Sequence, residues 1–376
     1  MTLPASVPIQ GLTPASLLPL MPGATLSEAR KVLSAAHKRH TALDAPIVID
    51  GVRAASARAL EGKVHLGALE VSSHQRSRED PFEKWLFSLD DGLQVETVRI
   101  PLEKEGRFSV CVSSQAGCAQ GCTYCATGQL GLLRSLAAWE IVEQVRTVQM
   151  DLATAGEKQS RTRPRVHGVV FQGMGEPMAN LDAVLAAVDI LSEPGGCAVS
   201  QAGMTLSTVG SNPGGIRRLA VEAPKVRLAL SIGAARPEVR QRIMPIERVH
   251  PLRTVVMDAA VEHALTTGLA PLWAVTPLAG VNDAREDAEA LAELALEFKE
   301  RTDIAPRISL VPYNAIGGDD PFQRVSDQLT GEFRDVMRDM GVFSHLRYSG
   351  GGDVGAACGQ LAGASKAQGE QGEMTA

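Results

Sequence analysis

The sequence predicts an α/β fold, a partial (β/α)6 barrel preceded by a small N-terminal accessory domain. From residue 107 onward, short β-branched runs alternate with amphipathic helical patterns, which is typical of βα units around a parallel sheet. Six such runs occur, a number that suits a partial or complete barrel. Polar motifs follow several of the runs, at the strand ends where barrels of this kind collect their functional groups.

The region before the barrel has a different texture, with a helical stretch at 26–40 and few aromatic residues. Two short strands joined by the turn Asp90-Asp91-Gly92 are expected to link it to the barrel. The end of the chain lacks the apolar content that folding requires. The predicted segments are an accessory domain at 1–80, linking strands at 81–106, the barrel at 107–350, a glycine-rich loop at 351–363 and a disordered tail at 364–376.

The barrel elements follow from the hydrophobic pattern. Its two clearest outer helices cover 137–153 and 283–301. The first places Ile141, Val145, Val148 and Leu152 on one face. The six predicted strands cover residues 107–113, 166–172, 204–210, 226–233, 271–277 and 307–313.

Composition narrows the class of protein. The chain is 44% hydrophobic and 21% charged, as expected of a globular protein, and prolines interrupt the apolar N-terminus before it reaches transmembrane length. We therefore expect a cytoplasmic protein without a membrane contact. The net charge of −6 argues against a large basic surface that binds nucleic acid by charge alone, although two basic stretches, 30–40 and 158–167, could contact phosphate.

Four of the six cysteines lie between residues 111 and 125, which does not resemble the distributed disulfide framework of a secreted protein. Cys118, Cys122 and Cys125 form the pattern C-x3-C-x2-C. A zinc site would need a fourth ligand, and none lies nearby in the sequence. Three thiolates instead fit a [4Fe-4S] cluster with one open iron, which could bind S-adenosylmethionine. With Tyr124 before the last cysteine, the spacing resembles the radical-SAM superfamily signature; a zinc loop or metal-free thiols are the alternatives.

A second motif, GMGEP, occupies residues 173–177. Alone it is weak evidence, because ordinary strand-to-helix turns have the same composition. Downstream of the cysteine loop, Gly175 and Glu176 are expected to supply backbone and carboxylate acceptors for the ammonium group of S-adenosylmethionine, as the comparable motif of the superfamily does.

Four stretches occur in an order that closely resembles the RlmN/Cfr family of radical-SAM RNA adenine methyltransferases. They are CVSSQAGCAQGCTYCATGQLGL, GMGEPMANLDAV, MTLSTVG and AACGQLAG, and the resemblance covers roughly residues 83–363. The cysteine of the last stretch, Cys358, is not a general superfamily feature, so the resemblance is specific.

The resemblance implies roles for individual residues. Cys358 would carry the methyl group as S-methylcysteine, Cys111 would resolve the protein–RNA adduct by forming a disulfide with Cys358, and Glu96 would accept the proton from the adenine carbon. Cys118, Cys122 and Cys125 would bind the cluster. The implied S-adenosylmethionine contacts are Gly175, Glu176, Ser207, Ser231 and Asn314.

The resemblance also implies partners. The substrate would be an adenosine of structured RNA, 23S rRNA and in some members tRNA, methylated at C2 in RlmN-type enzymes and at C8 in Cfr-type enzymes; we favour C2. A monomer is expected, with a donor such as flavodoxin supplying electrons, and residues 1–80 could contact RNA. The alternatives are a divergent paralogue that uses the same thiol chemistry on another substrate, and an iron–sulfur redox sensor.

One position departs from the family pattern, and one cysteine has no matching role in it. Gly233 stands where the family usually has a histidine, which removes a hydrogen bond and a stacking surface near the expected cofactor site. Cys197, in a loop-like stretch, matches no functional position and is interpreted as an incidental thiol.

Overall fold

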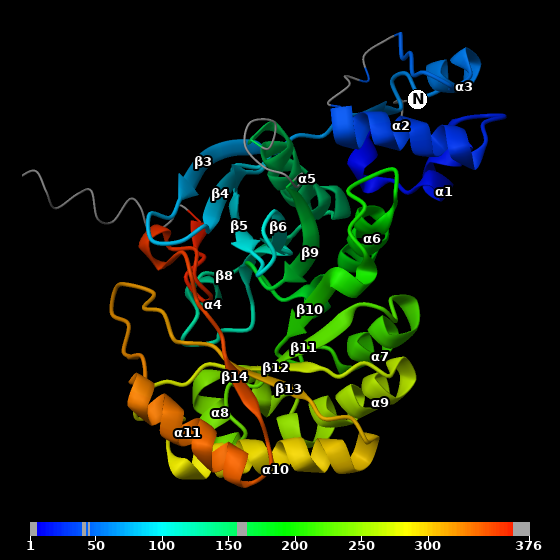
Figure 1. Ribbon diagram of the computed structural model, residues 1–376. Coiled ribbons are helices and arrows are strands. Elements are labelled where there is room, and N and C mark those ends of the chain that lie inside the picture. Colours follow the sequence, from blue (N-terminus) through cyan, green and yellow to red (C-terminus); the bar gives the residue numbers. More distant parts are fainter. Residues whose placement is uncertain (1–5, 40–42, 44–45, 156–163, 364–376) are drawn as a thin grey trace, which may run out of the picture.

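The computed structural model describes residues 6–39, 43, 46–155 and 164–363 (Figure 1). Within them, ten strands form one continuous curved sheet in the order β14-β13-β12-β11-β10-β9-β6-β5-β4-β3. Helices cover the outer face of the sheet, and a separate N-terminal unit packs at one end. The predicted tail, residues 364–376, lies outside the described residues.

The parallel part of the sheet confirms the six predicted strands and adds a seventh, β14. β14 is three residues long and largely exposed, so no apolar run marks it in the sequence. The parallel strands are β6 (Arg107–Val112), β9 (Arg165–Phe171), β10 (Met204–Thr208), β11 (Arg227–Ser231), β12 (Leu272–Val275), β13 (Arg307–Leu310) and β14 (Ser344–Leu346). Their C-terminal ends meet at one edge, as parallel alignment requires.

Three antiparallel strands extend the sheet on the other side of β6: β3 (Glu70–Arg76), β4 (Glu83–Ser88) and β5 (Gln94–Pro101). The turn at residues 90–92 joins β4 to β5, and the amide of Leu89 donates to the carbonyl of Leu93 over 2.8 Å. β3 falls inside the range 1–80 that the sequence assigns to the accessory domain, but it pairs with β4 in the main sheet. Its residues are mostly polar and exposed, so it carries no alternating pattern.

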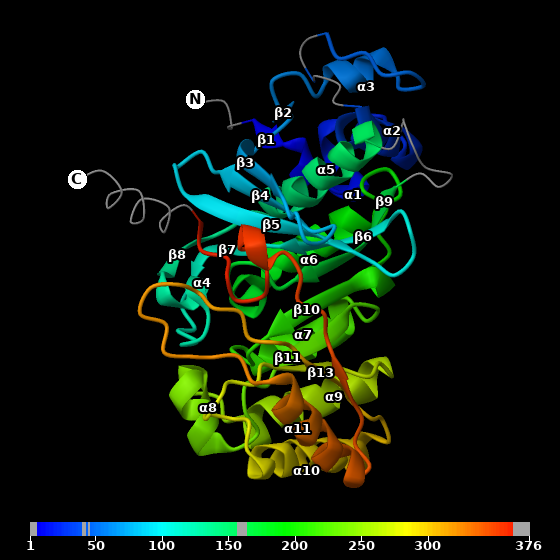
Figure 2. The same cartoon turned by 60° about the vertical axis from the view of Figure 1, so that its left-hand side comes forward.

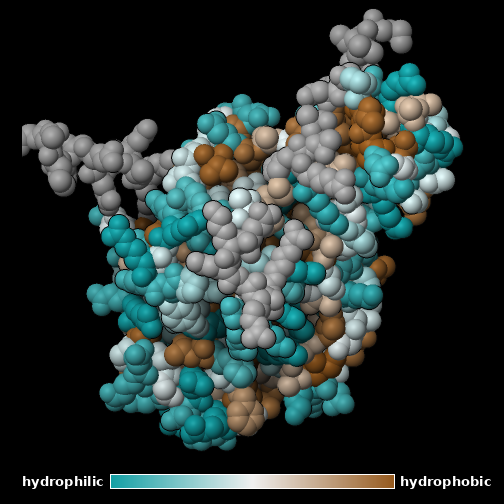
Figure 3. Space-filling model, turned by 45° about the horizontal axis from the view of Figure 1, so that its top comes forward, coloured by the Kyte–Doolittle hydropathy of each residue, from teal (hydrophilic) through white to brown (hydrophobic). Residues whose placement is uncertain are grey.

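The N-terminal unit has its own hydrophobic cluster, formed by residues between Ile9 and Val64. Its elements are β1 (Val7–Pro8), α1 (Pro14–Leu17), α2 (Leu26–Arg39), α3 (Ala54–Arg58) and β2 (Val64–His65). Figure 3 shows hydrophobic residues on the surface of this unit, next to hydrophilic ones.

The basic stretch on α2 contacts the rest of the protein. Arg30 forms an ion pair with Glu193 at 2.8 Å, and the Lys38 ammonium donates to the carbonyl of Pro194 at 2.9 Å. These two cations therefore hold the N-terminal unit against the barrel. Most of the other basic stretch, 158–167, lies outside the described residues.

The outer layer consists of α5 (Ala138–Ala155), α6 (Leu181–Ser192), α7 (Pro213–Glu222), α8 (Pro237–Ile243), α9 (Met257–Thr267), α10 (Arg285–Thr302) and α11 (Asp327–Asp339). On α5, the predicted core face of Ile141, Val145, Val148 and Leu152 is buried. None of the described helices combines the length and the apolar content needed to cross a membrane.

After β14 the chain turns back toward β3 and β4, the opposite end of the sheet (Figure 2). Residues 348–363, here named the C-terminal segment, contact that end through Asp80. The Asp80 Oδ2 atom accepts hydrogen bonds from the Gly351 amide and from the Tyr348 hydroxyl, both at 2.9 Å. The C-terminal segment thus bridges the two edges of the open sheet.

Candidate active site

The cysteine loop follows β6 and is framed by a small hairpin. β7 (Gln115–Cys118) pairs with β8 (Gly131–Ser135), and α4 (Ala126–Gln129) lies between the loop and β8. Backbone hydrogen bonds fix the loop: the Cys125 amide donates to the Cys122 carbonyl at 3.2 Å, and the Thr123 amide to the Ile243 carbonyl at 3.0 Å. The spacing of the three cysteines is therefore set by main-chain geometry.

One cavity of about 140 Å³ gathers most of the residues expected to bind the cofactors. It lies at the C-terminal ends of the parallel strands. The predicted residues on its wall are Cys118, Cys122, Cys125, Gly175, Glu176, Ser207, Ser231 and Cys358. Cys118 and Cys358, which are 240 positions apart in the sequence, thus share one cavity.

Glu176 follows a turn that only glycine accommodates. Gly175 has φ +96°, and a Cβ there would lie 2.5 Å from the Gln115 Cβ. The Glu176 carboxylate accepts the Met178 amide at 3.0 Å and the Val209 amide at 3.1 Å. Burial raises the pKa of Glu176 above its usual value, with the Val209 amide opposing the effect.

Arg240 on α8 is linked to this carboxylate through Val209, whose amide donates to Glu176 and whose carbonyl accepts from Arg240. The sequence did not predict this role. The Arg240 guanidinium donates to the carbonyls of Val209 at 2.8 Å and Ile232 at 2.9 Å, and it forms a buried ion pair with Glu247. It thereby joins the ends of β10 and β11. The sequence offered no signal, because Arg240 lies in the polar stretch PEVRQRI, where it looks like a solvated arginine.

The space next to Gly233 is filled by Met244. Gly233 has φ +70°, and a side chain there would collide with the Met244 sulfur. The same sulfur accepts the Tyr124 hydroxyl at 3.5 Å. Met244 therefore packs where the histidine expected from the family pattern would begin.

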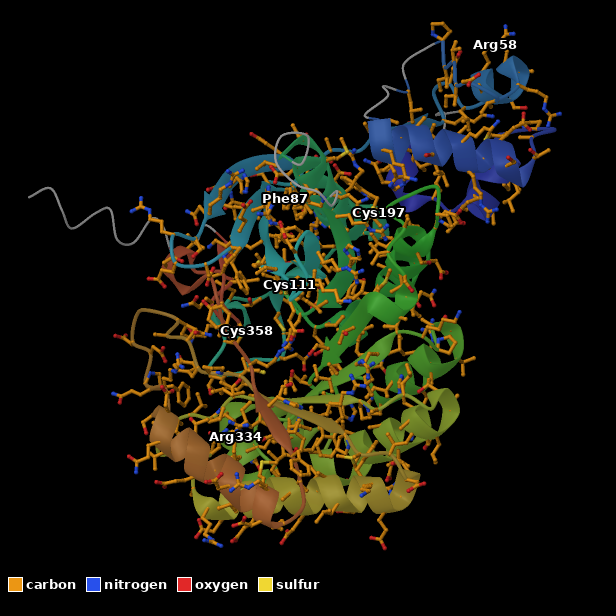
Figure 4. All side chains as sticks on the ribbon, in the orientation of Figure 1. Arg58, Phe87, Cys111, Cys197, Arg334 and Cys358 are labelled. Atoms are coloured by element: carbon orange, nitrogen blue, oxygen red, sulfur yellow. The ribbon has the colours of Figure 1, made fainter. Side chains whose placement is uncertain are left out.

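A second cavity, of about 370 Å³, adjoins the first and is lined by Cys111. Both cavities include Cys125, Gln172 and Cys358 in their walls. In Figure 4, Cys111 and Cys358 lie in the same central region of the molecule. Burial raises the pKa of both thiols, although Cys358 as a residue is the more exposed of the two. Cys358 therefore stands where the two cavities meet.

Two further predicted residues lie against the C-terminal segment. Asn314 donates to the Ser349 hydroxyl at 2.8 Å and to the Cys358 carbonyl at 3.3 Å. Glu96, on β5, accepts the amides of the segment at Ala362 and Gly363. Their contacts position this segment.

Cys197 lies apart from the other cysteines, near the N-terminal unit (Figure 4). It is buried, its carbonyl accepts the Gln149 amide at 3.4 Å, and burial raises the pKa of its thiol to about 12. The structure thus places it away from the two cavities.

The donor set of the first cavity fits an iron–sulfur cluster. Three cysteines line one cavity, and burial raises the pKa of the Cys118 thiol to about 12, so its thiolate needs a cationic partner. Among the described residues, no three His, Cys, Asp or Glu side chains converge as ligands of one metal ion. A cluster differs from a single ion in spreading its thiolates over separate irons.

Comparison with known proteins identifies the family. The radical SAM superfamily profile matches residues 112–263. A protein of Sorangium cellulosum, named a probable RNA methyltransferase, is 50% identical over 90% of this chain and 88% of its own length. The dual-specificity RNA methyltransferase RlmN of Syntrophobacter fumaroxidans is 41% identical over 80% of this chain and 82% of its own.

The solved structures agree with this match. The crystal structure of a radical SAM methyltransferase from Sphaerobacter thermophilus aligns with a TM-score of 0.82 and 32% identity, and it covers 94% of this chain and 99% of that one. The fold is thus that of a radical SAM enzyme. The chain belongs to the RlmN/Cfr family of radical SAM RNA methyltransferases.

Proposed function

We propose that this chain transfers a methyl group from S-adenosylmethionine to carbon 2 of an adenosine in structured RNA, with 23S rRNA as the main substrate and tRNA as a second one. One observation carries the proposal: Cys358 stands where two cavities meet. One cavity holds the three cysteines of the C-x3-C-x2-C motif, and the other holds Cys111. Family membership supports the substrate class.

The cofactor assignments rest on the first cavity. Cys118, Cys122 and Cys125 would hold the [4Fe-4S] cluster, and the methionine end of S-adenosylmethionine would lie against Gly175 and Glu176. When bound, the cluster supplies the electron that cleaves S-adenosylmethionine to a 5′-deoxyadenosyl radical. Ser207 and Ser231, whose hydroxyls lie 3.5 Å apart, would bind the other end of the cofactor. Asn314, which follows β13 and donates to the C-terminal segment, would also contact it.

The two remaining thiols, those of Cys358 and Cys111, would have different roles in the methyl transfer. The Cys358 sulfur would accept a methyl group from one S-adenosylmethionine, which leaves S-adenosylhomocysteine and a proton. The methyl group on Cys358 would lose one hydrogen atom to the 5′-deoxyadenosyl radical, and its carbon would then bond to the adenine carbon. The adduct would give up one electron to the oxidised cluster and the proton of the adenine carbon to a base. The Cys111 thiolate would then attack the Cys358 sulfur. The S–S bond forms as the S–C bond breaks, and the electron pair passes to the departing carbon, which takes a proton and becomes the methyl group.

The proton of the adenine carbon needs an acceptor, a role that the family resemblance assigns to Glu96. In this structure the Glu96 carboxylate is bound to two backbone amides of the C-terminal segment, and it would have to leave them to act as a base. A flavodoxin-like donor, a monomeric state and a cytoplasmic location complete the proposal.

The test uses protein purified anaerobically with its cluster reconstituted. It is incubated with S-adenosylmethionine carrying a deuterated methyl group, a reductant and ribosomal RNA, and the nucleosides are analysed by mass spectrometry. C2-methyladenosine with two deuteriums in its methyl group is the expected product. A C8 product would overturn the regiochemistry. Formation of 5′-deoxyadenosine and methylation of Cys358 without any methylated nucleoside would overturn the substrate.

The matched control is Cys358→Ala, which removes the carrier thiol from an exposed position. This variant should still bind the cluster and form 5′-deoxyadenosine, but no methyladenosine. Methyladenosine from Cys358→Ala would contradict the carrier role.

A further inference from the structure

The two basic stretches of the sequence meet at one cavity between the N-terminal unit and the barrel. Lys38, from the stretch 30–40, and Arg165, from the stretch 158–167, both line this cavity, and α5 and the loop 196–198 form most of its remaining wall. Its volume of about 330 Å³ is within the range of small-molecule sites, about 300–1,000 Å³. None of the residues that line it lines either active-site cavity. The cavity is therefore separate from the active site.

The charge on the wall of this cavity is positive. Arg146 on α5 pairs with Glu143 through two nitrogens, each at 2.7 Å, so this pair is neutral overall. The Lys38 ammonium donates to the Pro194 carbonyl, which uses one of its three protons and none of its charge. Within the described part of the chain, no carboxylate lines the cavity. The charges of Lys38 and Arg165 are thus available to attract an anion.

The cavity has cations at its mouth and buried polar groups at its floor. Lys38 and Arg165 are exposed, whereas His37 and Arg146 are only 3% and 4% exposed. Two buried atoms on the wall, His37 Nδ1 and Gln149 Oε1, have no hydrogen-bond partner among the described residues. Because buried polar atoms are normally paired, these two atoms indicate a ligand that accepts from a ring nitrogen and donates to an amide oxygen.

A phosphate group matches this set of partners. Its oxygens accept hydrogen bonds from an imidazole N–H, an ammonium and a guanidinium, and lysine and arginine are the side chains that proteins commonly use to bind phosphate. A hydroxyl group, either on the phosphate itself or on an adjoining ribose, would donate to Gln149 Oε1. Both the charge of the cavity and its unpaired atoms therefore favour the same ligand chemistry.

We propose that this cavity is a phosphate-binding site, in which Lys38 and Arg165 attract the phosphate group and His37 and Gln149 bind it at the floor. The phosphate group belongs either to the backbone of an RNA or to a free phosphate compound. The site requires neither the cluster nor S-adenosylmethionine, so the proposal does not depend on the reaction proposed above.

His37 provides a direct signal of binding. Burial lowers the pKa of His37 to about 4, and the nearby charges of Arg146 and Lys38 act in the same direction, so the ring is neutral at pH 7. A bound phosphate would bring negative charge next to the ring and favour its protonated form. The pKa of His37 should therefore rise when phosphate binds.

The first experiment titrates the full-length protein, with its cluster reconstituted, with inorganic phosphate while chloride keeps the ionic strength constant. The histidine rings carry a carbon-13 label, and nuclear magnetic resonance follows the His37 signal, which is identified by its loss in His37→Gln. The expected result is a saturable shift of this signal and a rise in the pKa of His37 by about one unit or more.

The variants Lys38→Gln and Arg165→Gln change exposed residues and should fold normally. Each should weaken phosphate binding by about tenfold, because each removes a charge-assisted contact. Lys38→Arg keeps the positive charge and should retain most of the binding. The matched controls are Lys299→Gln and Arg285→Gln, which change exposed residues of α10 and should bind phosphate like the wild type.

A second experiment distinguishes the two sources of the phosphate group. The affinity for a ribosomal RNA fragment is measured over a range of salt concentrations. If the site binds the RNA backbone, Lys38→Gln and Arg165→Gln should each weaken RNA binding and reduce the slope of log K against log salt by about one. If the site binds a free phosphate compound, RNA binding should stay unchanged while the phosphate titration of the variants is still weakened.

The proposal is overturned if Lys38→Gln and Arg165→Gln bind both inorganic phosphate and RNA as the two control variants do. Neither measurement requires methylation. A wild-type protein that methylates no RNA would therefore contradict the proposed function, while these titrations would still decide whether the phosphate site exists.

Discussion

The cysteine loop and the C-terminal segment bring thiols to the same cavity but are held in different ways. The loop is framed by the local hairpin of β7 and β8 and fixed by backbone hydrogen bonds. The C-terminal segment is fixed mainly by side chains of residues far away in the sequence, among them Asp80, Lys84 and Glu96. The cysteine loop is thus framed mainly by a local hairpin, although the Thr123 amide also bonds to the distant Ile243 carbonyl. The C-terminal segment depends on long-range polar contacts throughout.

The largest effect is expected for a substitution in the cysteine loop. Cys122→Ser should abolish the iron–sulfur absorbance and the formation of 5′-deoxyadenosine, because a hydroxyl does not replace a thiolate as a cluster ligand. The measurement is iron content with the visible spectrum after anaerobic reconstitution. Cys197→Ser is the matched control and should keep the cluster. A normal cluster in Cys122→Ser would remove this cysteine from the ligand set.

The second-largest effect is expected for Arg240, which is linked to Glu176 through Val209. Arg240→Met leaves Glu247 buried without its cation and two carbonyls without their donor, so the free energy of unfolding should fall by about 3–5 kcal/mol. Urea unfolding measures the loss. Arg285→Met breaks an exposed pair with Glu289 and should cost less than about 1 kcal/mol. Equal losses in the two variants would show that Arg240 does not support the site.

A smaller effect tests the turn before Glu176. Gly175→Ala should lower the free energy of unfolding by about 1–3 kcal/mol and weaken S-adenosylmethionine binding, because the new Cβ meets Gln115. Gly341 has a similar positive φ with open space around it, so Gly341→Ala isolates the backbone strain. Calorimetry of unfolding and of binding compares the two. Loss of binding in Gly341→Ala as well would assign the effect to strain alone.

The smallest effect is expected at Asp80, which accepts hydrogen bonds from the C-terminal segment. Burial opposes ionisation of Asp80, but the Gly351 and Phe82 amides and the Tyr348 hydroxyl outweigh it and lower its pKa. A lowered pKa means that the stabilisation is complete above about pH 4, where the unfolded carboxyl is already ionised, and is lost as the pH falls through the folded value.

Hydrogen exchange should therefore show the C-terminal segment loosening below about pH 4 while the cysteine loop keeps its protection. Asp80→Asn should remove this pH dependence and loosen the segment at neutral pH. Loosening of both regions together in acid would contradict the separation drawn above.

The parts of the molecule that local pattern encodes could be predicted from the sequence. The six apolar strands, the outer helix α5 and the gathering of Cys118, Cys122, Cys125 and Glu176 at one edge follow from hydrophobic periodicity and the position of motifs after strands. The strands β3 and β14 could not be predicted, because they lie at the sheet edges and are largely exposed.

The long-range polar contacts could not be predicted from the local sequence either. Arg240 occupies a helix position that looks like any solvated arginine, and Lys84 looks like the polar face of a strand. Their roles become clear only from the carbonyls that they bind in the folded protein. Arg240 donates to the Val209 carbonyl, and Lys84 donates to the Gly355 carbonyl. The family resemblance singled out Glu96 as a functional residue, but only the structure identifies the groups that its carboxylate binds.

The bridge from Asp80 to Gly351 spans 271 residues. Contacts between such distant positions form late, because the chain between them must first be ordered. During synthesis from the N-terminus, the cysteine loop can fold long before Cys358 has been made. The hairpin of β7 and β8 can therefore form before Cys358 exists, and Cys358 joins the other cysteines at the cavity only when the sheet is bridged.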